Sequence, residues 1–118
     1  MQPRTRVNVT HAGDVIIAQL TDRKILDEPN ITQIGEQLRG LIAEEPRPRL
    51  VLDFDLVSHM SSSTLGMLIT LNKRVREREG QLRLCNIHPA LREIFAITRL
   101  DEILDIHDSR NSAVTSLE

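Results

Sequence analysis

Segments with the periodicity of strands alternate with segments with the periodicity of helices along this chain. Two strand-like segments come first, at Val7–Val9 and Val15–Leu20, and His11–Asp14 between them is typical of a tight turn. From Ile31 onwards, helix-like and strand-like segments follow one another in turn. Strands that alternate with helices favour a sheet covered by helices, so an α/β fold that opens with a β-hairpin is predicted.

Start and stop signals indicate where the later elements lie. Proline fits the first turn of a helix but cannot continue one, and glycine is favoured just after a helix ends. The polar segment Thr21–Pro29 is interpreted as a loop. The predicted elements after it are a helix that ends at Glu44–Pro48, a strand at Leu50–Leu52 and a helix from Ser62 or Ser63 that stops at Gly80. A strand at Gln81–Leu84 follows, and then a helix opened by Pro89 with Leu91, Ile94, Phe95 and Thr98 on one face. The last predicted elements are an edge strand within Leu100–Ile106 and a terminal helix after Asp108.

The core of such a fold must be aliphatic, because Phe54 and Phe95 are the two aromatic residues among 118. Stacking on single-stranded nucleic acid needs exposed rings, and phosphate binding needs a basic excess, whereas 15 basic residues here face 17 acidic ones. We therefore expect no nucleic-acid partner. The basic run Lys73–Arg78 is typical of a solvated helix face, with contact to an acidic partner as the alternative. The length allows one hydrophobic core, so residues 1–118 are predicted to form a single domain.

Disulfide, metal and membrane classes are also disfavoured. Cys85 is the single cysteine, so it cannot form an internal disulfide, and we expect it to be a small buried residue. The four histidines, at positions 11, 59, 88 and 107, lack the short spacing of metal ligands. No apolar run approaches the roughly 20 residues of a membrane span. The prediction is a cytoplasmic protein without direct membrane insertion, metal or cofactor.

Four hydroxyl residues in a row, Ser61–Thr64, lie where a loop is expected to turn into a helix. Serine and threonine are preferred N-caps, because their oxygens accept hydrogen bonds from N–H groups of the first turn. Capping accounts for one or two hydroxyls, and the others are then free beside N–H groups and a helix dipole that favour an anion. A phosphate on one of these serines would be tolerated and would add a charge of roughly −1.5 to −2. Gly66, one turn later, is expected to let another backbone approach.

The stretch Met60-Ser-Ser-Ser-Thr-Leu-Gly66 resembles the Met-Asp-Ser-Ser-Gly-Leu-Gly-like signature of the STAS domain family, the bacterial anti-sigma-factor antagonists and their relatives. The similarity continues in order from about Val7 to Val114, and it includes Leu50-Val-Leu-Asp-Phe54 before the signature and Ile94-Phe-Ala-Ile-Thr-Arg-Leu-Asp101 after it. The resemblance implies a four- to five-stranded mixed sheet with an opening β-hairpin and with helices packed mainly on one face.

The same resemblance implies a function without catalysis. Such domains bind an anti-sigma factor that is also a serine kinase, and phosphorylation of the serine after the motif aspartate releases this partner. That serine corresponds to Ser62. Because Ser61 stands at the aspartate position and Thr64 at that of the following glycine, Ser61 and Ser63 are also phosphoacceptor candidates. The residues expected to contact the partner are Ser58, His59, Met60, Thr64 and Gly66.

Other functions stay open at this point. A STAS domain without serine phosphorylation could serve as a scaffold in a stress-signalling assembly or as a subunit associated with a membrane transporter, and self-association is open as well. Asp53 and Asp55 are also spaced like the nucleophile and the acid/base of haloacid-dehalogenase-type phosphatases, which work with Mg²⁺. The ordinary interpretation of this pair is strand-end aspartates that accept hydrogen bonds in a turn.

Overall fold

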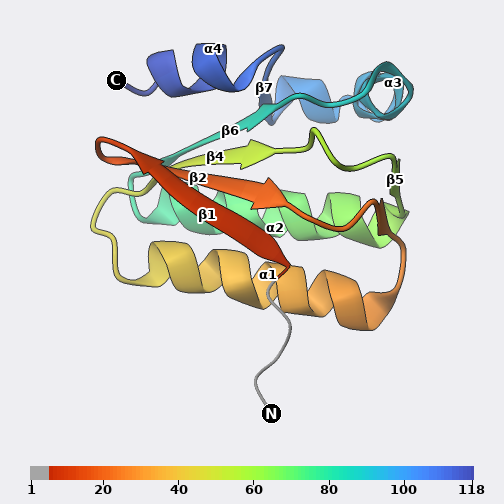
Figure 1. Cartoon of the computed structure of the whole chain (residues 1–118), viewed down its shortest axis with the longest axis horizontal. Coiled ribbons are helices and arrows are strands. Elements are labelled where there is room, and N and C mark those ends of the chain that lie inside the picture. Colours follow the sequence, from red (N-terminus) through yellow and green to blue (C-terminus); the bar gives the residue numbers. More distant parts are fainter. Residues whose placement is uncertain (1–5) are drawn as a thin grey trace.

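The computed structural model describes residues 6–118, and a five-stranded sheet runs through its centre (Figure 1). Its strands are β1 (Val7–Ala12), β2 (Val15–Leu20), β4 (Arg49–Asp53), β6 (Gln81–Cys85) and β7 (Asp105–His107). They lie in the order β1-β2-β4-β6-β7, in which β1 and β2 pair antiparallel and the other neighbours pair parallel. The predicted mixed sheet with an opening hairpin is confirmed.

Helices cover both faces of this sheet unequally. The helices within residues 6–118 are α1 (Glu28–Ala43), α2 (Ser62–Glu77), α3 (Pro89–Ile97), the short 3-10 helix η1 (Leu100–Glu102) and α4 (Arg110–Thr115). α1 and α2 lie side by side on one face, and α4 lies on the other (Figure 1). The termini of α1 and α2 therefore meet at the same two ends of the molecule, which places the start of α2 beside the start of α1.

Two hydrophobic clusters hold these layers together, because successive side chains of a strand point to opposite faces. In β2, Ile16, Ala18 and Leu20 enter the larger cluster, under α1 and α2. Val15 and Ile17 enter a smaller cluster on the α4 side, which also contains Val51, Cys85, Ala113, Val114 and Leu117. The larger cluster also receives Leu91 and Phe95 from α3. The prediction of helices mainly on one face is confirmed, and α4 covers the second face.

Two local predictions differ from the structure. The segment Thr21–Pro29, predicted as a loop, contains the two-residue strand β3 (Lys24–Ile25), whereas the start of α1 at Glu28 agrees with the acidic and proline start signals at Asp27–Pro29. A strand of two residues is too short for any periodicity to mark it. In α3, Ile94 and Thr98 are exposed although they were predicted to share the buried face. The helix ends at Ile97, and the Thr98 hydroxyl donates a hydrogen bond to Ile94 O at 2.7 Å instead of packing in the core.

The C-terminal end of α2 depends on both Glu79 and Gly80, whereas the sequence suggested Gly80 alone as the stop signal. Glu79 N donates to Arg76 O and Gly80 N donates to Val75 O, both at 2.9 Å, which is the Schellman pattern of a helix end. The left-handed residue of this motif is Glu79, with a φ of 59°, and not the predicted Gly80. Glycine is needed at position 80 for a different reason, since a Cβ there would lie 2.3 Å from Pro48 O.

Cys85 provides a first testable prediction. Its side chain is fully buried as predicted, and burial, together with the nearby Asp53 carboxylate, raises the pKa of the thiol to about 12. Because the thiolate is the reactive form, the folded protein is expected to resist a disulfide reagent such as DTNB at pH 8 and to react once urea unfolds it. The thiol of the unfolded chain has a pKa near 9.0. Between pH 9.0 and about 12 the unfolded chain therefore loses the thiol proton while the folded protein keeps it, so the free energy of unfolding falls as pH rises through this interval. Rapid labelling of the native protein would contradict this prediction.

Candidate functional site

The candidate site lies at the end of the sheet where the parallel strands finish, beside β3 and its two-residue partner β5 (His59–Met60) (Figure 1). Two loops are joined there by backbone hydrogen bonds. The N–H groups of Ser58 and His59 donate to Arg23 O at 2.7 and 3.2 Å, and the Ser58 hydroxyl donates to the same oxygen at 3.1 Å. Ser61 N donates to Ile25 O at 3.1 Å. These bonds fix the chain that leads into α2.

The four hydroxyls of Ser61–Thr64 have four different environments. Thr64 is fully buried, and its hydroxyl donates to Ile25 O at 3.0 Å. The Ser63 hydroxyl donates to Oε1 of Glu28, at the start of α1, at 2.7 Å. Ser61 Oγ lies 3.4 Å from Thr64 Oγ1. Ser62 is exposed, and its hydroxyl has no hydrogen-bond partner among residues 6–118.

The start of α2 is not capped by a side chain. Ser61 is the N-cap residue, yet its side chain accepts no hydrogen bond from the first turn, so the predicted capping by a serine is wrong. The first N–H groups of a helix lack partners within it, and the helix dipole favours a negative group at this end. Ser62 is the first residue of α2, so its hydroxyl projects from a helix end that is electrostatically suited to an added phosphate.

The residues expected to contact a partner are not equally available. His59 is exposed, Ser58 is half-buried, and Met60 is half-buried against the larger cluster. Thr64 departs from the expectation, because its buried side chain joins α2 to β3 and offers no surface. Gly66 was expected to let another backbone approach, but no described atom comes within 4 Å of its Cβ position. The surface at Gly66 is open to solvent.

The STAS domain model matches residues 6–113 of this chain. The chain belongs to the STAS domain family. It is 24% identical over 113 residues to the anti-sigma F factor antagonist of Paenibacillus polymyxa, which covers 96% of this chain and 95% of the relative. Its fold is similar to that of an anti-sigma-factor antagonist (STAS) domain protein from Planctomyces limnophilus, with a TM-score of 0.85, 21% identity and coverage of 94% and 97%. The unphosphorylated form of the antagonist SpoIIAA matches with a TM-score of 0.67 and 15% identity, over 93% of this chain and 94% of that chain.

Asp53 of this STAS domain is engaged in a buried network and is not presented to solvent. Its side chain is 2% exposed, and Oδ2 accepts a hydrogen bond from Arg110 Nε at 2.8 Å and forms an ion pair with Arg110 Nη2 at 2.6 Å. Oδ1 accepts from Asp55 N at 2.9 Å and from Asn86 Nδ2 at 3.0 Å. The predicted turn hydrogen bond is present, while the ion pair to Arg110 was not foreseen. A carboxylate that is buried and held by these donors is not accessible to a substrate, so this geometry disfavours the phosphatase hypothesis.

Two exposed leucines belong to the same end of this STAS domain, and the sequence reasoning missed them. Leu26 follows β3 and is 48% exposed, and Leu56 precedes the loop into β5 and is 44% exposed. A large aliphatic residue within a polar connection is a signal that could have identified them. Because the burial of exposed leucine side chains in an interface is favourable, these two residues add an apolar component to a contact surface around β5 and the start of α2.

Two properties of residues 6–118 bear on membrane and metal binding. None of the described helices is both long and apolar enough to cross a bilayer. In the same part of the chain, no three His, Cys, Asp or Glu side chains gather closely enough to hold a metal ion.

Proposed function

We propose that this chain is a regulatory domain that binds a kinase-type anti-sigma factor through the β5–α2 end and that phosphorylation of Ser62 switches this binding. The observation that carries the proposal is the difference among the four hydroxyls. Ser62 is exposed and unpaired among the described residues, whereas Ser63 is bonded to Glu28 and Thr64 is buried. Ser62 is therefore the exposed serine of this run that a kinase can modify without breaking a hydrogen bond within residues 6–118.

The rival acceptors are less suited to phosphate for identifiable reasons. Phosphorylation of Ser63 would break its hydrogen bond to Glu28 and bring a dianion close to a carboxylate. The Ser61 hydroxyl is half-buried and faces Thr64. Transfer to Ser62 joins the γ-phosphorus of ATP to Oγ, releases ADP and passes the hydroxyl proton to a base of the kinase. It needs no rearrangement of this chain.

The phosphate would act on the complex more than on the fold. A dianion at the start of α2 interacts favourably with the helix dipole, so the free domain keeps its structure. In the complex the same dianion would be taken out of water without a matching partner charge, which costs several kcal/mol. Phosphorylation is therefore expected to weaken binding by at least about 100-fold.

The test uses the purified chain, ATP and a candidate kinase-type anti-sigma factor from the same organism. We expect one phosphate, located on Ser62 by mass spectrometry, absent in Ser62→Ala and retained in the matched variants Ser61→Ala and Ser63→Ala. Titration calorimetry with the same partner should give weaker binding after phosphorylation. A kinase that binds ATP and the chain but leaves Ser62 unmodified would overturn the switch. An absence of binding would overturn the proposed partner as well.

A further inference from the structure

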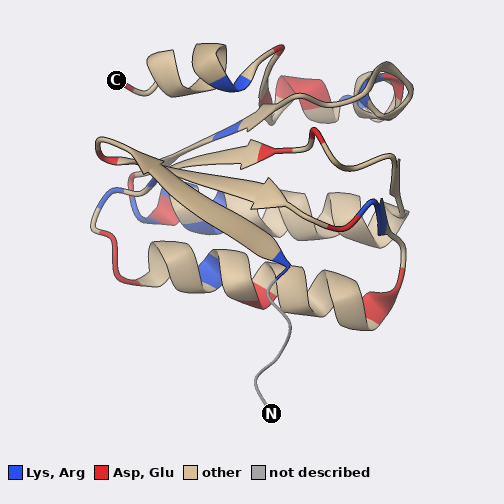
Figure 2. Cartoon of the chain, in the orientation of Figure 1, with Lys and Arg blue, Asp and Glu red and all other residues tan. Residues whose placement is uncertain are grey.

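A cluster of positive charge lies far from Ser62, between the C-terminal halves of α1 and α2. Residues 73–78, at the end of α2, contain four basic side chains and one acidic side chain, although the whole chain has a net charge of −2. One basic residue, Arg39, also lies on the later part of α1 (Figure 2). Ser62 and Arg74 are twelve residues apart, which corresponds to roughly 18 Å along the helix. This basic region is therefore separate from the candidate site.

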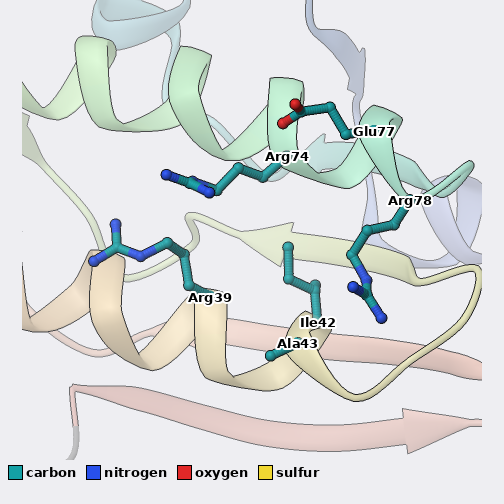
Figure 3. A pocket seen from close by; sticks show the side chains of 6 residues that line it. All are labelled: Arg39, Ile42, Ala43, Arg74, Glu77 and Arg78. Carbon is teal, nitrogen blue, oxygen red and sulfur yellow. The ribbon is translucent and has the colours of Figure 1, made fainter.

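A groove between the two helices collects these charges. Its volume is about 340 Å³, and its lining residues are Arg39, Ile42, Ala43, Arg74, Glu77 and Arg78. Figure 3 shows Arg39 from α1 and Arg74 from α2 extending toward the same end of the groove, while Glu77 points away from α1. Arg78 turns to the loop after α1 and donates from Nε and Nη2 to Glu45 O, at 3.0 and 2.7 Å. Arg39 and Arg74 form no ion pair or hydrogen bond with any of residues 6–118.

Helix dipoles do not account for this arrangement. They favour basic residues in the last turn of a helix, where Arg74 and Arg76 are found in α2. Arg39, however, precedes the last turn of α1. Its guanidinium folds back over Gly35, since a Cβ at that glycine would lie 3.4 Å from both Arg39 Nη1 and Met67 Cγ of α2. Two cations are thus held on adjacent helices without a carboxylate between them.

We propose that the groove between α1 and α2 binds an acidic segment of a partner protein, with carboxylates on Arg39 and Arg74 and an aliphatic side chain on the exposed Ala43 and the stems of the two arginines. Guanidinium groups form paired hydrogen bonds with carboxylates, and their stems add apolar surface to the groove. A small free anion would use only the charged tips and would leave Ala43 and the arginine stems uncovered. This second docking surface would let the domain hold one partner at Ser62 and another at the opposite end of the same helices.

The probe is a fluorescein-labelled peptide of alternating leucine and glutamate, and its control has glutamine in place of every glutamate. Fluorescence anisotropy should show saturable binding of the acidic peptide that weakens with added salt. We expect Arg39→Gln/Arg74→Gln to weaken this binding by about tenfold. The matched variant Lys73→Gln/Arg76→Gln removes the same two charges from the same region but outside the groove, and it should change affinity by less than about twofold.

Three results would overturn the proposal. The first is an absence of saturable binding up to about 1 mM acidic peptide, a concentration that detects even weak complexes. The second is an equal loss in both double variants, which would mean that the peptide responds to overall charge alone. The third is binding of inorganic pyrophosphate at Arg39 and Arg74 together with no preference for the acidic over the neutral peptide, which would indicate a small-anion site. Circular dichroism of both double variants checks that they fold.

Discussion

Replacement of Arg110 by alanine is expected to lower the free energy of unfolding by about 3 kcal/mol. Arg110 lies at the start of α4, and its guanidinium forms a hydrogen bond and an ion pair with Asp53, a carboxylate that is 2% exposed at the end of β4. Without Arg110 the buried charge keeps only two donors, Asp55 N and Asn86 Nδ2. Removal of one partner from a buried pair costs roughly 3–5 kcal/mol, and the lower end applies because Arg110 itself is 39% exposed.

Replacement of the other partner, Asp53, distinguishes the contribution of the ion pair from the cost of burying the Asp53 charge. In Asp53→Asn the buried group is neutral, and Arg110 can turn toward solvent, so the loss should be smaller than in Arg110→Ala. The double variant Asp53→Asn/Arg110→Ala should then lose less than the sum of the two single variants, because the second change removes a partner that is already absent. Urea unfolding followed by circular dichroism measures all three, since the chain has no Trp or Tyr for fluorescence.

The control for this prediction is another arginine–aspartate pair. Arg92 donates to Asp108, and that hydrogen bond and the Arg92 charge lower the pKa of the Asp108 carboxyl. Both side chains are largely in solvent, at 46% and 86% exposure, where an ion pair contributes little. Arg92→Ala should therefore leave the unfolding midpoint unchanged within error. Equal losses in Arg92→Ala and Arg110→Ala would mean that burial of Asp53 does not set the strength of its pair.

The Asp53 network illustrates which interactions local sequence patterns can indicate. The hydrogen bond from Asp55 N spans two residues, and the Asp-x-Asp spacing at a strand end predicts it. The ion pair to Arg110 spans 57 residues, and it depends on how α4 packs over the second face of the sheet. Local spacing carries no information about that approach. The α/β fold and the long helices were predictable because their hydrophobic periodicity extends over many residues, whereas the pairing of β3 with β5 involves two residues on each side.

The candidate site was predictable in place but not in detail. The run Ser61–Thr64 marked the start of α2, and the resemblance selected Ser62 among its hydroxyls. Which hydroxyls are already bonded depends on Glu28 and Ile25, which are distant in sequence and reach the run through the packing of α1 and β3. Thr64 could not be distinguished from its neighbours by type, because a buried threonine and an exposed serine are both ordinary at a helix start.

Gly80→Ala is expected to lower the free energy of unfolding by about 3 kcal/mol, the upper part of the range for a side chain forced into filled space. A Cβ at this position would lie 2.3 Å from Pro48 O and 2.7 Å from Pro48 Cγ. Pro48 O cannot easily move, because Gln81 N donates to it at 2.8 Å where β6 begins beside β4. The clash therefore involves backbone that the sheet holds in place. A loss below about 1 kcal/mol would mean that this junction relaxes more freely than the geometry indicates.

Gly66→Ala, in contrast, should raise the free energy of unfolding. It therefore tests the proposed partner contact near the start of α2 separately from folding. Gly66 lies within α2, and nothing described comes within 4 Å of its Cβ position, so alanine should stabilise the helix by about 1 kcal/mol. If the proposed partner covers this position closely, the added methyl group should nevertheless weaken the complex by about tenfold, as measured by calorimetry. A variant that folds more stably and binds less tightly cannot owe its lost affinity to unfolding. Unchanged affinity in Gly66→Ala would place the contact elsewhere on the surface, whatever happens at Ser62.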